Sequence, residues 1–476
     1  MRVSAVGALL ALGTLSLSSC RTQPPAPVVQ QPQATTAWRE DLLGAPVAPS
    51  AAWWTEFQDD ALNALVEQAL ANSPSIGAAR ARVLVAQQER RAIAGQQELQ
   101  ANLYADAALQ RGSENRPGGA FSGGTNQLYG AGVELTWEAD LWGRLESQVQ
   151  VADEALAVSV ELRRVAADAL IAELARERAE LRGAQGELLV LERSLSLLRE
   201  SLELERSRLA GGFSTELDVA RLEAEVAASL ALVPNLQGRV EAARHRLAGL
   251  AACDVAQVER WTAGAQERGV VPVDLALGTP LDALENRSDV RLAQRELLRQ
   301  TALLGLAEAE TKPRLSIGAA LGTQTDDLGS LVDASSRTLN LGGSFLAPLF
   351  NGQRLEAARD AQLARAEAAA EDWRATVLRA WSETEAAIVE LRRERQRLEA
   401  LQAQRTIQER ALVLARDRQQ NGLVDYFEVL AAQRALLTVD QELARTETAL
   451  LQRTVSLLRA IGGQWRASPD EASQSS

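Results

Sequence analysis

The chain has 476 residues and a formal net charge of −13, and 46% of its residues are hydrophobic but only 4% aromatic. The acidic balance argues against nucleic acid as a partner. His245 is the single histidine, so a histidine-based metal site or acid–base pair is not supported. We therefore expect no catalytic residue, no metal and no cofactor.

The first residues have the pattern of an export signal. Arg2 precedes an apolar run over residues 6–17, which is too short to span a bilayer as a helix. We predict a cleaved signal peptide over residues 1–19. The sequence L-S-S-C that ends at Cys20 resembles a bacterial lipobox, which predicts lipidation of Cys20. The alternative is an ordinary signal peptide with an incidental cysteine.

A lipidated, Pro-rich tether is predicted over residues 20–50, where proline, glutamine, alanine and threonine dominate. Arg21 follows the cysteine where an aspartate would indicate inner-membrane retention. The expected location is therefore the outer membrane, to which acyl chains would anchor the chain.

Two short helical patterns follow the tether. The stretch W-W-T-E-F-Q-D-D (53–60) precedes an amphipathic helix, and N-S-P-S-I (72–76) opens a second helix that reaches about Glu98. N-R-S-D-V (286–290) repeats the second opening and predicts a helix from about Asp289 to Glu310.

Both regions then change to a period of two. Apolar residues alternate over residues 101–110 and 315–322, and again, after loops rich in glycine and serine, over 129–137 and 339–345. These are four predicted β-strands, each about 9–11 residues long, which is enough to cross a membrane in a tilted barrel.

Two very long helices are predicted next. No proline occurs from Arg144 to Ala210 or from Gln353 to Asn421, so each helix would be about 100 Å long at 1.5 Å per residue. Leucines recur at spacings of three and four, as in coiled coils. These are Leu188, Leu191, Leu195, Leu198 and Leu202. Glycine turns at Gly212 and Gly422 then lead into shorter helices.

The two turn regions are copies of one sequence. R-L-A-G-G-F-S-T-E-L-D-V-A begins at Arg208, and R-Q-Q-N-G-L-V-D-Y-F-E-V-L begins 210 residues later at Arg418. A period of this length is too long for a solenoid unit. We therefore predict two large repeats, 51–260 and 261–465, followed by a disordered tail, 466–476.

Four strands cannot lie in a membrane alone. An open sheet edge in hydrocarbon leaves backbone groups without hydrogen bonds, which costs several kcal/mol for each group. The strands must therefore close with those of other copies. An eight-stranded barrel is filled by side chains, so conduction favours three or more copies.

Several stretches together resemble the TolC-like superfamily of outer-membrane efflux proteins, specifically the NodT-type lipoproteins of tripartite RND efflux systems. They are W-W-T-E-F-Q-D-D-A-L (53–62), W-E-A-D-L-W-G-R-L (137–145), F-S-T-E-L-D-V-A (213–220), A-P-L-F-N-G-Q-R (347–354), G-L-V-D-Y-F-E-V-L-A-A-Q-R (422–434) and I-G-G-Q-W (461–465). The resemblance covers nearly everything from Cys20 to Trp465.

The resemblance implies a fold that is mainly α with a membrane β-barrel. A homotrimer would form a twelve-strand barrel, continued by a coiled-coil α-helical barrel in the periplasm. The implied partners are a periplasmic adaptor, an inner-membrane RND pump and outer-membrane lipid, and the implied function is passive export of small molecules. A type I protein-secretion exit is the runner-up. A periplasmic scaffold or a secreted hydrolase has less support from the sequence.

The resemblance also implies a periplasmic gate of acidic side chains at the hairpin tips. Glu428 matches one gate position, whereas Ala431 stands where a second acid would be, and Asp425 is a possible substitute. Asp218 is the acid of the other tip. The alternative for Asp425 and Glu428 is stabilisation of a helix N-terminus, worth about 0.3–1 kcal/mol.

Other notable residues have mainly structural interpretations. Arg208 and Arg418 would either form salt bridges between neighbouring hairpins or favour helix C-termini. Cys253 is expected to be a reduced, buried thiol, and His245 a solvated or packed side chain. Trp137 and Trp142 would lie either at the membrane interface or in the junction between strand and helix.

Overall fold

The computed structural model of the protein describes residues 52–111, 125–263 and 280–463. The predicted signal peptide, Cys20, the tether and the tail lie outside these residues. The chain divides into two compact units, and both predicted repeats contribute to each. Of the described residues, unit 1 contains 84–111, 125–158 and 295–372, and unit 2 contains 52–83, 159–263, 280–294 and 373–463. The boundaries of the repeats stay a prediction.

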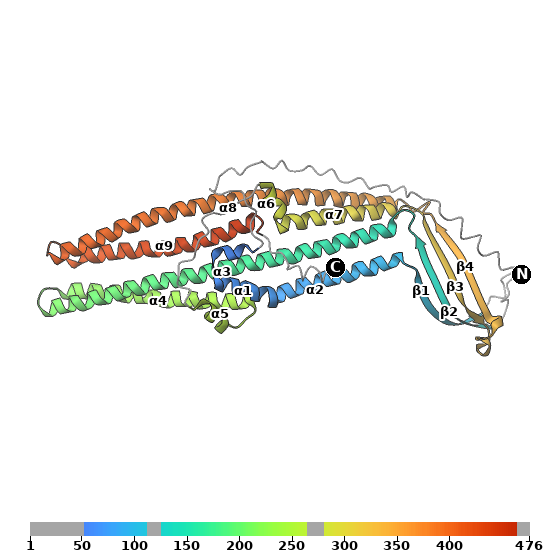
Figure 1. Ribbon diagram of the computed structural model, residues 1–476, viewed down its shortest axis with the longest axis horizontal. Helices are drawn as coiled ribbons and strands as arrows, with labels where there is room; N and C mark the ends of the chain where they lie inside the picture. Colours follow the sequence, from blue (N-terminus) through green and yellow to red (C-terminus); the bar gives the residue numbers. More distant parts are fainter. Residues whose placement is uncertain (1–51, 112–124, 264–279, 464–476) are drawn as a thin grey trace. The chain divides into compact units, whose positions relative to one another are not determined.

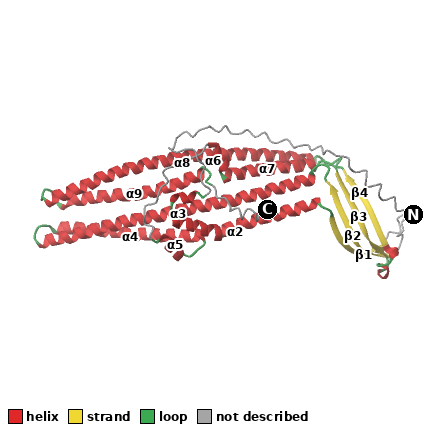
Figure 2. Cartoon of the chain, viewed as in Figure 1, coloured by secondary structure: helices red, strands yellow, loops and turns green. Residues whose placement is uncertain are grey.

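Unit 1 contains one antiparallel sheet with the strand order β1-β2-β3-β4 (Figure 2). The strands are β1 (Gln100–Arg111), β2 (Thr125–Ala139), β3 (Arg314–Thr325) and β4 (Arg337–Leu346). Two short 3-10 turns, η3 (Leu328–Ser330) and η4 (Ala334–Ser336), lie between β3 and β4. All four predicted strands are thus confirmed, although β2 is longer than expected. Among the described residues, the outer edges of β1 and β4 pair with no strand.

The sheet has one apolar and one polar face. One directly paired row across the four strands consists of Leu103, Val133, Leu321 and Leu339. These side chains are 43% to 85% exposed. The adjacent row consists of Asn102, Glu134, Ala320 and Asn340, and its side chains point to the opposite face because successive residues of a strand alternate. This arrangement explains the period of two in the sequence.

The longest helices form two hairpins (Figure 1). The first pairs α3 (Arg144–Ala210) with α4 (Glu216–Ala251), and the second pairs α8 (Arg354–Gln420) with α9 (Tyr426–Ala460). Both α3 and α8 have 67 residues. Helix α8 begins and ends 210 residues after α3, the same distance that separates the two turn sequences. The long helices of the sequence analysis are therefore confirmed.

The shorter helices differ more from the expectation. They are η1 (Trp53–Phe57), α1 (Asp60–Asn72), α2 (Pro74–Ala94), η2 (Gly95–Gln97), α5 (Val255–Thr262), α6 (Pro280–Asn286) and α7 (Ser288–Ala309). Helix α2 ends at Ala94 rather than at Glu98, because a 3-10 turn intervenes before β1. The sequence did not predict α5 and α6.

The leucine row of α3 packs as a coiled coil. Leu191 and Leu195 contact Leu236 of α4, and nearer the turn Leu198 and Leu202 cluster with Leu222 of α4. The spacing of three and four is therefore confirmed as the contact row of a helix pair. None of the helices that the structure describes combines the length and apolarity required to cross a bilayer.

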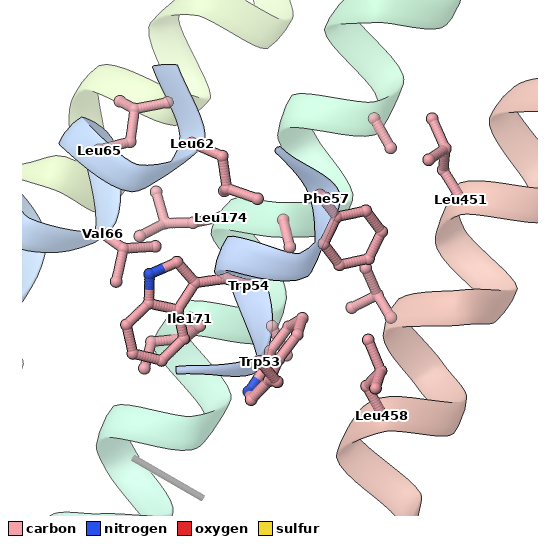
Figure 3. Close-up of a cluster of buried hydrophobic side chains, with 14 of the residues drawn as sticks. Trp53, Trp54, Phe57, Leu62, Leu65, Val66, Ile171, Leu174, Leu451 and Leu458 are labelled. Atoms are coloured by element: carbon pink, nitrogen blue, oxygen red, sulfur yellow. The ribbon is translucent and has the colours of Figure 1, made fainter. Parts of the chain in front are cut away.

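The largest apolar core lies in unit 2 around η1. Trp53 is 1% exposed, and its ring meets that of Phe57 edge-on with 6.2 Å between centroids. Figure 3 shows Trp53 between Ile171 of α3 and Leu458 of α9, and Phe57 beside Leu451 of α9. The segment W-W-T-E-F therefore joins the first hairpin to α9.

Candidate functional site

The turns at Gly212 and Gly422 have the same backbone geometry. Phe213 N–H donates to the carbonyl oxygen of Arg208 at 2.8 Å, and Leu423 N–H donates to that of Arg418 at 2.9 Å. The φ angles of the two glycines are +76° and +67°. This is the Schellman helix ending, which places its left-handed residue at glycine because no Cβ is present.

Substitution of Gly422 by alanine is expected to lower the free energy of unfolding by about 1–2 kcal/mol, the cost of a left-handed conformation with a Cβ. The measurement is urea-induced unfolding followed by circular dichroism. Gly238 lies inside α4, and the space that a Cβ would occupy there is open, with nothing within 4 Å. Gly238→Ala should therefore stabilise by about 0.5–1 kcal/mol. Equal effects of the two substitutions would contradict this account of the turn.

The three predicted acids differ in their local partners. Asp425 is the N-cap of α9, and its carboxylate accepts from Glu428 N–H at 3.4 Å. Asp218 accepts from the Thr215 hydroxyl at 2.6 Å and lies 3.8 Å from Arg221. Glu428 is exposed, and its carboxylate has no hydrogen bond or ion pair among the described residues. Glu428 therefore presents the least engaged carboxylate of the three.

The two predicted arginines contribute chiefly through their backbone. Their carbonyl oxygens accept the hydrogen bonds that close both turns. The Arg208 guanidinium lies 3.9 Å from Glu205 on its own helix, and Arg418 is exposed with no ion pair in the described part of the chain. Within one chain, neither side chain bridges the two hairpins.

Sequence reasoning missed a cluster that joins the two tips. The Tyr426 ring packs on a group of buried apolar residues from α3, α4 and α9, namely Leu198, Leu202, Val219, Leu222 and Leu430. The Arg221 guanidinium lies 5.2 Å from the centroid of the Phe427 ring, and Arg434 pairs with Glu225. These contacts hold the first turn of α9 against the first hairpin.

Two ionisable groups at the tips are withdrawn from solvent, Glu205 fully and Tyr426 partly. Glu205 is 3% exposed and accepts from the Ser214 hydroxyl. Burial is the largest influence on Tyr426 and raises the pKa of its hydroxyl. The sequence could not indicate that these two side chains are withdrawn from solvent at the tips. A glutamate on a helix usually faces solvent, and a tyrosine on a helix usually packs in a hydrophobic core without a special role.

A second link joins the hairpins farther from the turns. Glu187 of α3 is 3% exposed and lies 2.8 Å from Arg239 of α4 and 3.1 Å from Arg445 of α9. Gly183 faces Thr448, whose hydroxyl would lie 2.0 Å from a Cβ at Gly183. The helices therefore approach closely here, and a larger residue at Gly183 would force Thr448 to move.

Two other residues of the sequence analysis lie away from the tips. Cys253 is a free thiol, but it is partly exposed rather than fully buried, because it follows the C-terminal end of α4. Desolvation, with a smaller effect of Asp254, raises its pKa. His245 is exposed on α4, which favours the solvated alternative.

Comparisons with known proteins agree with this architecture. The family model described as outer membrane efflux protein matches residues 65–252 and 279–463. The pyoverdine export outer membrane protein OpmQ of Pseudomonas putida is 30% identical over 95% of this chain and 96% of its own length. Nodulation protein T of Rhizobium leguminosarum bv. trifolii is 26% identical, with coverage of 83% and 84%.

A solved structure gives the same result. The outer-membrane channel OprN is similar with a TM-score of 0.82 and 29% identity, over 92% of this chain and 98% of that chain. The resemblance inferred from the sequence motifs is thereby confirmed. The chain belongs to the outer membrane efflux protein family.

Proposed function

We propose that three copies of this chain form a passive exit duct for small molecules, without a catalytic step. The observation that carries the proposal is the sheet of unit 1, which has an exposed apolar face, a polar face and two outer edges that pair with no strand among the described residues. Three copies would supply twelve strands and join β1 of each copy to β4 of the next. The apolar face would contact lipid and the polar face would line water.

Aromatic side chains support a membrane boundary at one end of the sheet. Trp137 and Trp142 are 41% and 48% exposed, and Phe350 is 95% exposed. All three lie near the end of the sheet at which the chain passes into the helices. Aromatic rings are favoured at membrane–water interfaces, so this exposure supports the interface interpretation over packing at the junction.

The hairpin tips are proposed to meet the periplasmic adaptor, and an inner-membrane RND pump would deliver the substrate. Phe213 and Leu423 occupy equivalent positions in the two turns and are 78% and 68% exposed. Exposed apolar side chains of this kind mark contact surfaces when they lie together. The relative OpmQ is described as a pyoverdine export outer membrane protein. This description supports small molecules over polypeptides as the cargo.

The anchor and the gate complete the proposal. Lipidated Cys20 would hold the chain at the outer membrane, with the helical barrel in the periplasm. The acids Glu428, Asp425 and Asp218 would surround the opening at the tips, where like charges in a ring attract cations. Among the described residues, the Glu428 carboxylate has no hydrogen bond or ion pair, unlike those of Asp425 and Asp218. This difference supports Glu428 as the main contributor to the charge of the ring.

A charge on the apolar face should block assembly in the membrane. Leu341 is 78% exposed in the middle of β4, and lysine at a lipid-facing midplane position costs about 2–4 kcal/mol. Leu341→Lys should therefore reduce the amount of assembled protein in outer-membrane fractions. Asn340→Lys, one residue away on the polar face, should leave assembly unchanged. The reverse order would contradict the assignment of the faces.

The proposal is tested by single-channel recording of the purified full-length protein in a planar bilayer. Discrete, cation-selective conductance steps are expected. An inserted assembly that shows no conductance would contradict the duct and would favour a scaffold function.

A further inference from the structure

A hollow of about 550 Å³ opens on the apolar face of the sheet. Its apolar walls come from β2, β3 and the residue before β1: Leu99, Leu135, Trp137, Ile317 and Ala319. It lies at the end of the sheet at which the strands adjoin the helices. Most of the hollow lies over the central strands β2 and β3. Its remaining wall, at Leu99, precedes the edge strand β1.

The wall formed by Trp137 offers apolar surface only. Its indole N–H donates to the carbonyl oxygen of Gln97 at 3.3 Å, so the single polar atom of the side chain is satisfied within the protein. Leu99 and Ile317 beside it are 60% and 43% exposed. Both side chains present hydrocarbon and no polar atom, so the hollow favours an apolar occupant.

One charged group lies at the rim of the hollow. Glu98 is exposed, and its carboxylate has no hydrogen bond or ion pair among the described residues. The backbone around it is fixed, since the Gln100 side-chain amide donates to the carbonyl oxygens of Gly95 at 2.7 Å and Glu98 at 3.2 Å. A carboxylate held beside an apolar wall matches a ligand with a cationic head and an apolar tail.

We propose that this hollow binds an acyl chain of phosphatidylethanolamine, whose primary ammonium pairs with Glu98. The inference rests on the proposed function, because the apolar face must lie in a bilayer. A phospholipid matches the position of the hollow near the membrane boundary, where Trp137 lies. Charge selects among phospholipids, because Glu98 attracts an ammonium headgroup and repels phosphatidylglycerol, which has a net negative charge.

Native mass spectrometry of the purified full-length assembly tests whether the Glu98 carboxylate selects the lipid headgroup. The assembly is incubated with phosphatidylethanolamine and phosphatidylglycerol of identical acyl chains, and the bound lipids are counted. Wild type should retain severalfold more phosphatidylethanolamine. Glu98→Gln should bring the ratio close to one, whereas Glu89→Gln, an exposed acid on α2, should preserve it. Equal retention of both lipids by wild type would overturn the inference.

A substitution that fills the hollow with a larger side chain tests whether the lipid binds there. Ala319→Phe should reduce retained phosphatidylethanolamine severalfold, whereas Ala131→Phe, on the same apolar face but outside the hollow, should not. Unchanged retention by Ala319→Phe would overturn the site. If the same preparation conducts in a bilayer, such a failure leaves the proposed function standing. An assembly that neither inserts nor conducts would instead refute the proposed function.

Discussion

Replacement of Asp59 by alanine should lower the free energy of unfolding by about 3–5 kcal/mol, because it leaves a buried charge without its partner. Arg178 is 2% exposed, and its Nε lies 3.0 Å from Asp59 Oδ2. Arg182 lies 3.4 Å from the same oxygen. Asp59 also caps α1 by accepting from Leu62 N–H at 3.1 Å. Urea-induced unfolding followed by circular dichroism measures the loss.

The neighbouring acid provides the control. Asp60 is exposed in the first turn of α1, and Asp60→Ala should cost about 0.3–1 kcal/mol. Burial lowers the pKa of the Arg178 guanidinium, and Asp59 opposes this shift. Removal of both charges in Asp59→Ala/Arg178→Met should therefore recover part of the stability. Equal losses for Asp59→Ala and Asp60→Ala would contradict the role of the buried pair.

Replacement of Glu428 by glutamine should reduce the cation preference of the open duct severalfold. The Glu428 carboxylate is exposed and unpaired among the described residues, and three copies would place three such charges around one axis. A ring of carboxylates concentrates cations at a constriction. The measurement is the reversal potential of single channels in a potassium chloride gradient, before and after the substitution.

Asp425 supplies a matched comparison on the same helix. Its carboxylate serves as the N-cap of α9, and asparagine caps helices about as well as aspartate. Asp425→Asn therefore removes the charge, keeps the helix start and should shift the reversal potential less than Glu428→Gln does. A larger shift from Asp425→Asn would assign the ring to Asp425 instead.

The sequence predicted the elements whose signal is local. The uninterrupted runs before Gly212 and Gly422 identified α3 and α8 nearly to the residue, because proline-free heptad patterns and glycine helix ends act over a few turns. The strands were found because their alternation occurs in both repeats. The turn glycines and capping acids of the candidate site are local signals of the same kind.

The contacts between elements were not predictable in this way. Asp59 and Arg178 are 119 residues apart in the chain, and nothing in either local pattern indicates the other. Glu187 and Glu205 stand on a helix rich in charged residues, so their burial depends on where the partner helices pass. The hollow beside Trp137 likewise requires the register of β2 with β3.

The most direct test of the central claim, that three copies close one barrel, is the mass of the detergent-extracted full-length protein by native mass spectrometry. The account predicts an assembly of three chains that persists in mild detergent. A stable assembly of two chains, with eight strands, or a monodisperse monomer that keeps its β-structure would contradict it.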